Sequence, residues 1–441
     1  MSDGLSSLPA RLARALTHSA VQADGAACPL GLHLAWEAGS GMAAGQLTLW
    51  PGVPGAAQLT CRAAPAVWEQ VLSAVPPVGC QSFGALRRRP DVFRVEGTEL
   101  SWVQALPFLE RLLETLRREG SASRTPALHT TAHSSAQTSA NAAAHEDSTH
   151  TAEPPAHLRA LSHIQGRYVQ LGTHPNTWVY SESCGNPQAP TMLMLHTAGS
   201  DTRQWHGLMA QTALRRDWHL LGFDMPGHGR SPLPQDEPNW TWRLTENRYI
   251  DCVLNYLDAL QLDRVSLMGC SMGAAISLAL LARHPDRFHG ALLLEAPYHS
   301  PGRRSPYLHH AQVHGARLSA AWVGALLSPT SPAAGRDYAT WIYSQGAPGV
   351  YDGDLAFYSD EYNAHTHTAH IDSARTPLWL FTGDYDYSAT PADSARIAQE
   401  IPGAHFETLT GFGHFPMVEN PDGLLPLIQP ALSTLLHTIA S

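Results

Sequence analysis

The sequence predicts an α/β protein with a mostly parallel, doubly wound sheet, preceded by a smaller α+β domain. Three observations support this prediction. From about residue 161 onward, continuous apolar runs typical of buried parallel strands alternate with helical patterns. The first 120 residues instead place short extended runs between Gly- and Pro-rich turns and close with a strongly periodic helix. Between the two lies a segment of Ser, Thr, Ala and His with almost no large apolar residues.

Composition limits the classes of function. The 441 residues are 44% hydrophobic and 15% charged, with a formal net charge of −10, so no basic face is available for nucleic acid. The longest basic run, Arg87-Arg88-Arg89, is typical of a solvated turn. Six scattered cysteines without a C-x-x-C pair predict neither a disulfide framework nor a zinc site. With no leader pattern and no run of 18 apolar residues, we expect a cytoplasmic protein without a membrane span.

The N-terminal domain is assigned to residues 1–120. Its strands are expected at Gly31–Trp36, Gly45–Trp50, Ala57–Arg62 and Val92–Val95, and its helices at Ala64–Val75 and Trp102–Arg118. This order of elements loosely resembles sterol-carrier-type domains, which implies a shallow apolar ligand cavity. A packing or dimerisation module fits equally well, and the apolar stripe of the last helix favours a homo-oligomer formed through this domain.

Residues 121–160 are predicted to be a disordered linker, and residues 161–441 a catalytic domain. From residue 298 to residue 371 the strand–helix alternation stops, and Tyr, His and Gly become frequent, so we expect an inserted helical lid there. The strands of the catalytic domain are expected at Arg167–Leu171, Thr177–Glu182, Thr191–His196, His219–Phe223, Val265–Met268, Ala291–Leu294, Leu378–Thr382 and His405–Leu409.

One stretch carries the strongest chemical signal. The apolar run Val265–Met268 enters a G-x-S-x-G motif at Gly269, Ser271 and Gly273, and an apolar helical pattern leaves it. Strand, tight turn and helix are the context that a nucleophile elbow requires. The serine hydroxyl would then stand clear of the sheet, and the N–H of Met272 at the helix start would be free to stabilise an oxyanion.

A serine hydroxyl becomes a good nucleophile only beside a base, and that base needs an orienting group. His414 lies in a Gly-rich loop just after a predicted strand, where its imidazole can turn toward a nucleophile. Asp384 and Asp386 end the preceding strand, and Glu295 ends another. The order serine, acid, histidine is the one expected when such groups lie at the strand ends of an open α/β sheet.

With these motifs, residues 161–441 resemble the α/β-hydrolase fold family. Besides the elbow, the chain has counterparts of the family's D-x-x-G-x-G-x-S loop, its G-x-x-D acid turn and its G-H base loop, at residues 224–231, 383–386 and 413–414. Four motifs in the family's order cover about the C-terminal two-thirds of the chain. The resemblance implies the α/β-hydrolase fold, a mostly parallel doubly wound sheet with a helical lid.

The resemblance also implies roles for single residues. Ser271 would be the nucleophile, His414 the general base and acid, and Asp386 the orienting carboxylate, preferred over Asp384 by its spacing from the glycine of the acid turn. Glu295 is a weaker third candidate for the acid. No metal or organic cofactor is expected.

The family usually supplies a second oxyanion N–H from an H-G-x turn after the third strand. Here the sequence is H-T-A, and Thr avoids positive φ, so we assign the N–H to Ala198 and keep Thr197 as the alternative. Thr197, Arg203 and Trp205 are predicted to contact substrate. A surface pair between Arg203 and Asp201 is an equally good interpretation of that arginine.

These features predict a serine hydrolase that cleaves a carboxylic ester or lactone through an acyl-enzyme. The aromatic lid favours a small, apolar or aromatic ester-like substrate. The same triad would also support hydrolysis of C–C or amide bonds, or acyl transfer to an acceptor other than water. A ligand-binding receptor on a hydrolase scaffold is the alternative from another class of protein.

Overall fold

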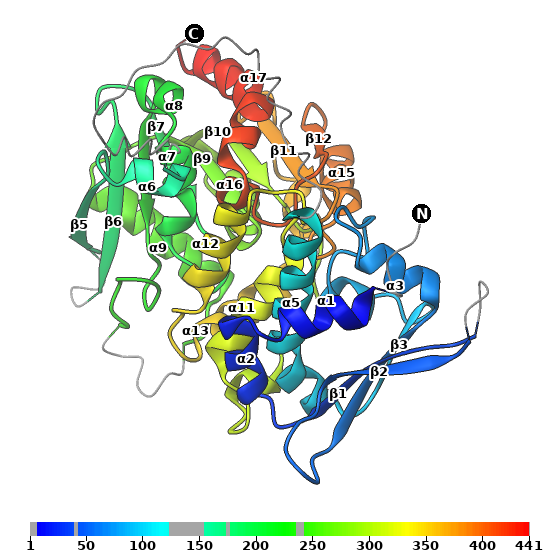
Figure 1. The fold of residues 1–441 in the computed structure, drawn as a ribbon. Coiled ribbons are helices and arrows are strands. Elements are labelled where there is room, and N and C mark those ends of the chain that lie inside the picture. Colours follow the sequence, from blue (N-terminus) through cyan, green and yellow to red (C-terminus); the bar gives the residue numbers. More distant parts are fainter. Residues whose placement is uncertain (1–6, 39–42, 123–153, 173–176, 235–241, 441) are drawn as a thin grey trace, which may run out of the picture.

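The computed structural model describes residues 7–38, 43–122, 154–172, 177–234 and 242–440 (Figure 1). Most of the predicted linker, residues 123–153, lies outside the described residues. The last part of the predicted linker forms the short helix α6 (Ala156–Ala160). The prediction of a disordered linker therefore stays a prediction for its central part.

An eight-stranded sheet forms the centre of the C-terminal two-thirds of the chain (Figure 1). Its strand order is β12-β11-β10-β9-β7-β8-β6-β5, parallel from β12 to β8, with β6 and β5 each antiparallel to the preceding strand. The strands are β5 (Gln165–Gln170), β6 (Trp178–Gly185), β7 (Thr191–Leu195), β8 (His219–Phe223), β9 (Val265–Cys270), β10 (Phe288–Leu294), β11 (Leu378–Gly383) and β12 (His405–Leu409). The predicted strands of this part are all present, and only their ends differ by a few residues.

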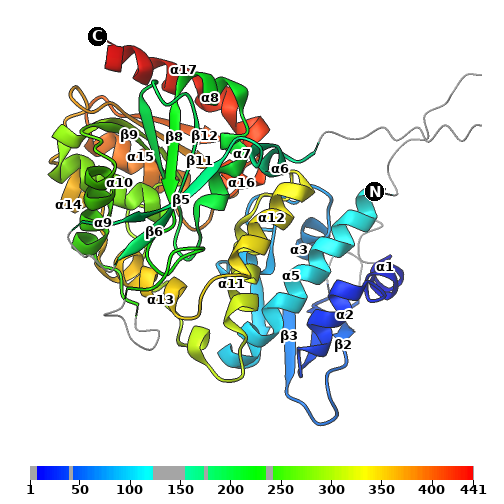
Figure 2. The same ribbon diagram turned by 90° about the vertical axis from the view of Figure 1, so that its left-hand side faces the viewer.

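The central strands are apolar throughout because helices cover both faces of the sheet (Figure 2). Along β9, Val265 and Leu267 join one core cluster, whereas Met268 and Cys270 join the other. The two-residue period of a strand thus divides one apolar run between two cores. One face carries α9 (Glu246–Ala259) and α10 (Met272–Arg283), and the other carries α7 (His206–Met209), α16 (Pro416–Glu419) and α17 (Pro421–Ala440).

The described N-terminal region, residues 7–122, has a four-stranded sheet of order β2-β1-β3-β4. Its helices include α1 and α2, which the sequence analysis did not anticipate. The elements are α1 (Leu8–Ala15), α2 (Ser19–Ala26), β1 (Gly31–Trp36), β2 (Gly45–Trp50), β3 (Gln58–Ala63), α3 (Pro65–Val71), α4 (Phe83–Arg87), β4 (Phe93–Glu96) and α5 (Glu99–Ala122). The predicted α+β character of this part is confirmed.

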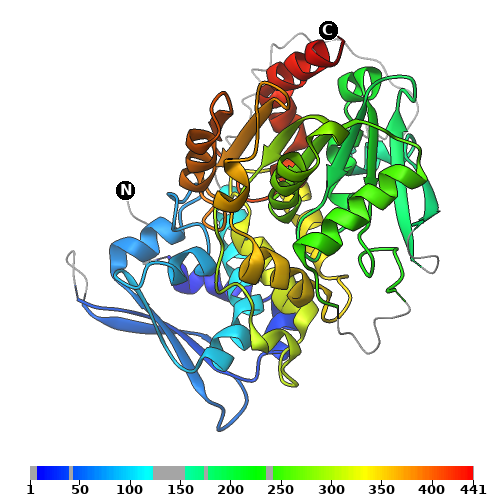
Figure 3. The same cartoon turned by 180° about the vertical axis from the view of Figure 1, so that it is seen from behind.

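The lid segment, residues 298–371, is helical in the structure. It contains α11 (Gly315–Leu326), α12 (Ala333–Tyr343), α13 (Val350–Leu355), a π-helical turn η5 (Ala356–Glu361) and α14 (His365–Thr368). α11 packs along α5 of the N-terminal region, and Leu318 and Ala321 belong to the same core cluster as the apolar stripe of α5 (Figures 2 and 3). The N-terminal region and the lid segment therefore share one hydrophobic core.

This packing bears on the predicted self-association. The apolar stripe of α5 motivated that prediction, and its leucines from Leu106 to Leu116 are buried within the chain itself. Self-association stays a prediction, now without the exposed stripe that suggested it.

Among the helices of the described residues, α17 alone has the length and mean hydropathy, 1.3, that a membrane-spanning helix needs. Its apolar side has another use, because Leu424, Ile428 and Leu432 are fully buried in the core on one face of the large sheet. Packing within the fold thus accounts for part of its apolar composition, since 28% of the apolar window is buried.

Candidate active site

The G-x-S-x-G stretch forms a strained turn between β9 and α10. Ser271 has φ +54°, a conformation that non-glycine residues rarely adopt, and such strain is typical of functional sites. A side chain at either glycine would clash with the backbone. A Cβ atom added to Gly269 would lie 2.3 Å from the Gly273 carbonyl oxygen, and one added to Gly273 would lie 2.2 Å from the Leu195 carbonyl oxygen. Both glycines are therefore needed for the helix and strand to approach closely enough to hold the turn.

Three strand-end loops bring Ser271, Asp386 and His414 together. The Nδ1 atom of His414 lies 2.5 Å from Oδ2 of Asp386, and Nε2 lies 2.9 Å from Oγ of Ser271. A carboxylate only accepts hydrogen bonds, so Nδ1 carries the proton and Nε2 is free to accept from the serine. The three side chains are almost completely buried. The arrangement can therefore take a proton from the serine hydroxyl.

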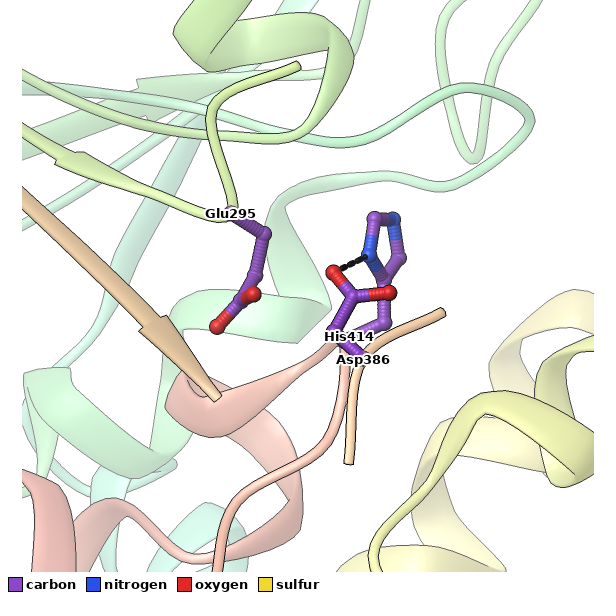
Figure 4. Close-up of side chains that lie close together, drawn as sticks. All are labelled: Glu295, Asp386 and His414. Atoms are coloured by element: carbon purple, nitrogen blue, oxygen red, sulfur yellow. Dashed lines mark hydrogen bonds and ion pairs between the residues drawn. The ribbon is translucent and has the colours of Figure 1, made fainter. Parts of the chain in front are cut away.

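The other two candidate acids have different partners. Asp384 accepts a hydrogen bond from the Gly411 N–H at 2.9 Å and so holds the base loop in place. Glu295 lies beside Asp386 but does not reach the imidazole, and it accepts the Gly383 N–H at 3.0 Å (Figure 4). Burial and the neighbouring Asp386 raise the pKa of Glu295 well above its usual value, which favours the protonated form of this carboxyl group.

Glu295, Asp386 and His414 also satisfy a simple distance criterion for a metal site, with donor atoms within 4.8 Å of one another (Figure 4). Two ligands on a tetrahedral zinc ion, with bonds of about 2.0–2.1 Å, stand about 3.3 Å apart. The His414–Asp386 distance of 2.5 Å is a hydrogen-bond distance instead. The donor set fits proton handling better than metal binding.

The turn after β7 has one N–H group without an acceptor among the described residues. The Thr197 N–H donates to the side-chain oxygen of Gln204 at 3.2 Å, and the Gly199 N–H donates to Asp354 at 2.7 Å. Within the described residues nothing accepts the N–H of Ala198, which lines the same cavity as Ser271. The positive φ of this turn falls on Gly199, at +68°, so the threonine causes no backbone strain. Ala198 is therefore the better placed of the two predicted donors.

A sequence model of the α/β hydrolase fold matches residues 190–421, which include the elbow, the acid turn and the base loop. The chain belongs to the α/β-hydrolase fold family. Some relatives match over nearly all of their own length, whereas others match over less than half of it. RutD of Pseudomonas syringae, provisionally named a carbamate hydrolase, is 28% identical over 277 residues, 58% of this chain and 97% of RutD. The (R)-3-hydroxydecanoyl-ACP:CoA transacylase of Pseudomonas aeruginosa is 25% identical over 64% of this chain and 93% of that protein.

Solved structures place the same part of the chain in this fold. The enol-lactonase of Burkholderia xenovorans LB400 superposes with a TM-score of 0.53 at 22% identity, covering 60% of this chain and 100% of the lactonase. Relatives of this α/β hydrolase by sequence are named hydrolases and esterases, and the chain is an enzyme of that family.

The cavity at Ser271 of this α/β hydrolase measures about 470 Å³. The lid segment contributes Tyr358, whose hydroxyl lies 3.3 Å from Oγ of Ser271, and Tyr351. The N-terminal region contributes a further wall, with Arg88 and Trp102. The sequence analysis did not predict this wall, because the N-terminal region carries no catalytic motif. The run Arg87–Arg89, interpreted there as a solvated turn, was the one sequence feature that could have indicated it.

The predicted substrate contacts divide between two places. Thr197 lines the cavity. Arg203 does not, because its guanidinium binds both oxygens of Asp201, at 2.8 and 2.6 Å, and stacks over Trp341. Trp205 is fully buried in the core behind the sheet. The substrate-binding role predicted for Arg203 and Trp205 is corrected accordingly, and the alternative pairing of Arg203 with Asp201 is the one found.

Proposed function

We propose that the protein is a serine hydrolase that cleaves a carboxylic ester or lactone through an acyl-enzyme intermediate. The observation that carries this proposal is the continuous hydrogen-bonded chain from Asp386 through His414 to Ser271, placed on a strained elbow at the bottom of a cavity. Esterases and lactonases among the similar proteins support the same bond class.

In the proposed reaction, Ser271 Oγ attacks the acyl carbon while Nε2 of His414 takes its proton. Asp386 holds the imidazole in the tautomer that can accept this proton and stabilises the resulting cation. The N–H groups of Ala198 and Met272 stabilise the developing oxyanion. The histidine then protonates the leaving alcohol and activates water, which releases the acid and restores Ser271.

Acyl transfer is a second candidate, since the chain is 25% identical to a transacylase over 93% of that protein's length. The same acyl-enzyme would then react with an acceptor thiol or alcohol in place of water. Adding methanol or cysteamine during ester turnover separates the two candidates, because a transferase forms the new ester or thioester at the expense of free acid.

Labelling with a fluorophosphonate probe tests the proposal. We expect stoichiometric labelling of the wild type and none of Ser271→Ala, together with loss of p-nitrophenyl ester turnover. Ser266→Ala is the matched control, because Ser266 is buried on β9, the strand that leads to Ser271, and lies outside the cavity. Absence of labelling in a well-folded wild type would count against an assembled triad and favour a ligand-binding receptor.

A further inference from the structure

Four arginines line the cavity that contains Ser271, and two of them already have carboxylate partners. Arg87 donates to Glu99 at 3.0 Å. Arg304 binds Asp352 at 2.7 Å and Asp360 at 3.2 Å. The charges of Arg87 and Arg304 are thus balanced within the protein.

The other two, Arg88 and Arg303, lack such partners. Arg303 donates to the carbonyl oxygen of Ser388 at 2.6 Å, which uses one N–H but leaves the charge uncompensated. In the part of the chain that the structure describes, no carboxylate and no hydrogen-bond acceptor meets the guanidinium of Arg88. Burial, and then the charge of Arg303, lower the pKa of Arg88, so the two like charges act on each other.

The acid turn connects these arginines to the reaction centre. The Ser388 N–H donates to Oδ1 of Asp386 at 2.6 Å, while its carbonyl accepts from Arg303. Tyr387, between Asp386 and Ser388 in the sequence, packs closely against α4. A Cβ atom added to Gly84 of α4 would lie only 2.6 Å from the Tyr387 hydroxyl. Arg88 follows α4 directly. The same turn therefore binds the histidine through Asp386 and Arg303 through Ser388, and its Tyr387 lies close to both arginines.

Nearby acids do not cancel this charge. Glu99 is the single acidic residue among the described residues that line the cavity, and it is paired with Arg87. Behind Tyr387, burial raises the pKa of Glu110 to about 8, so its carboxyl group is mostly neutral at pH 7. A positive cavity in a chain with a net charge of −10 would attract anions selectively.

We propose that Arg88 and Arg303 bind a carboxylate of the substrate, so that the preferred substrates are anionic esters, such as half-esters of dicarboxylic acids. A planar carboxylate fits two guanidinium groups that present several N–H donors. Naming this substrate class rests on the hydrolase function proposed for Ser271, whereas the anion site itself does not. It also modifies the expectation of a purely apolar or aromatic substrate, because the aromatic walls then end at a cationic pair.

A matched pair of esters tests the substrate class. We compare kcat/KM for mono-p-nitrophenyl adipate with that for its methyl-capped, neutral analogue, methyl p-nitrophenyl adipate. The wild type should prefer the anionic ester, and the preference should fall about tenfold in Arg88→Gln and in Arg303→Gln, the loss expected for one charge-assisted hydrogen bond. Arg88→Lys should retain part of the preference. The double variant Arg87→Gln/Glu99→Gln, which removes a balanced ion pair, should leave the ratio unchanged.

A binding measurement keeps the two proposals separable. Calorimetry with adipate on Ser271→Ala, which lacks the proposed chemistry, should show binding that Ser271→Ala/Arg88→Gln loses. Adipate binding in a protein that neither labels nor hydrolyses esters would support the anion site and overturn the hydrolase. Equal turnover of both esters with no adipate binding would overturn the anion site alone. Inorganic phosphate binding more tightly than adipate would overturn the assignment to a carboxylate.

Discussion

Replacement of Asp386 by asparagine is expected to lower kcat for ester hydrolysis about 10⁴-fold with little change in the fold. The carboxylate accepts the Nδ1–H of His414 at 2.5 Å and so keeps Nε2 unprotonated. An asparagine amide can donate to Nδ1 instead, which favours the tautomer with its proton on Nε2. That tautomer cannot take the proton of Ser271. Steady-state kinetics, with a circular dichroism spectrum for each variant, measure the effect.

Two matched variants control this experiment. Asp384→Asn, two residues away, should change kcat far less, because Asp384 binds a backbone N–H of the base loop and does not reach the imidazole. Glu295→Gln should also have a small effect, since Glu295 forms no hydrogen bond with the imidazole and the amide oxygen can still accept the Gly383 N–H. A loss in Glu295→Gln as large as that in Asp386→Asn would identify Glu295 as the orienting acid instead.

Much of this site could be predicted from local sequence. The elbow depends on glycines whose missing Cβ atoms leave room for nearby backbone, and the acid and base loops follow strands that can be located from short stretches of sequence. The choice between Asp384 and Asp386 followed from spacing alone. Such features are short-range, so a single sequence contains them.

What the sequence could not predict depends on contacts between distant segments. The apolar stripe of α5 looked available for another subunit, and its partner is α11, far along the chain. The sequence was equally compatible with two partners for Arg203, a substrate and Asp201. The positions of both side chains in the structure identify Asp201 as the partner. Arg87 and Arg88 are neighbours in sequence, but only Arg87 has a carboxylate partner. The position of Glu99, which binds Arg87, determines which of the two charges is neutralised.

Asp354 is a further residue that the sequence did not single out, because α13 carries no recognisable motif. Its fully buried carboxylate accepts hydrogen bonds from His228 at 2.7 Å, from the Gly199 N–H at 2.7 Å and from Trp242 Nε1 at 2.8 Å. It thereby joins the lid segment to the turn after β7 and to the loop that contains His228.

Replacement of Asp354 by alanine should lower the free energy of unfolding by about 3–5 kcal/mol, because it leaves a buried histidine and two buried N–H donors without an acceptor. Urea denaturation followed by tryptophan fluorescence measures the loss. Asp360→Ala is the control, because Asp360 forms an exposed pair with Arg304 and should cost less than about 1 kcal/mol. A similar loss in both variants would contradict the special position of Asp354.

The ion pair with His228 adds a pH dependence to this loss. Burial by itself would lower the pKa of His228, but Asp354 and the Pro226 carbonyl raise it above its usual value of about 6.5. Since the folded pKa exceeds the unfolded one, the charged pair contributes fully below about pH 6.5, and its contribution is lost as the pH rises through the folded pKa. The difference in unfolding free energy between the wild type and Asp354→Asn should therefore be larger at pH 6 than at pH 9. A difference independent of pH would mean that His228 is neutral in the folded protein and that Asp354 acts through its hydrogen bonds alone.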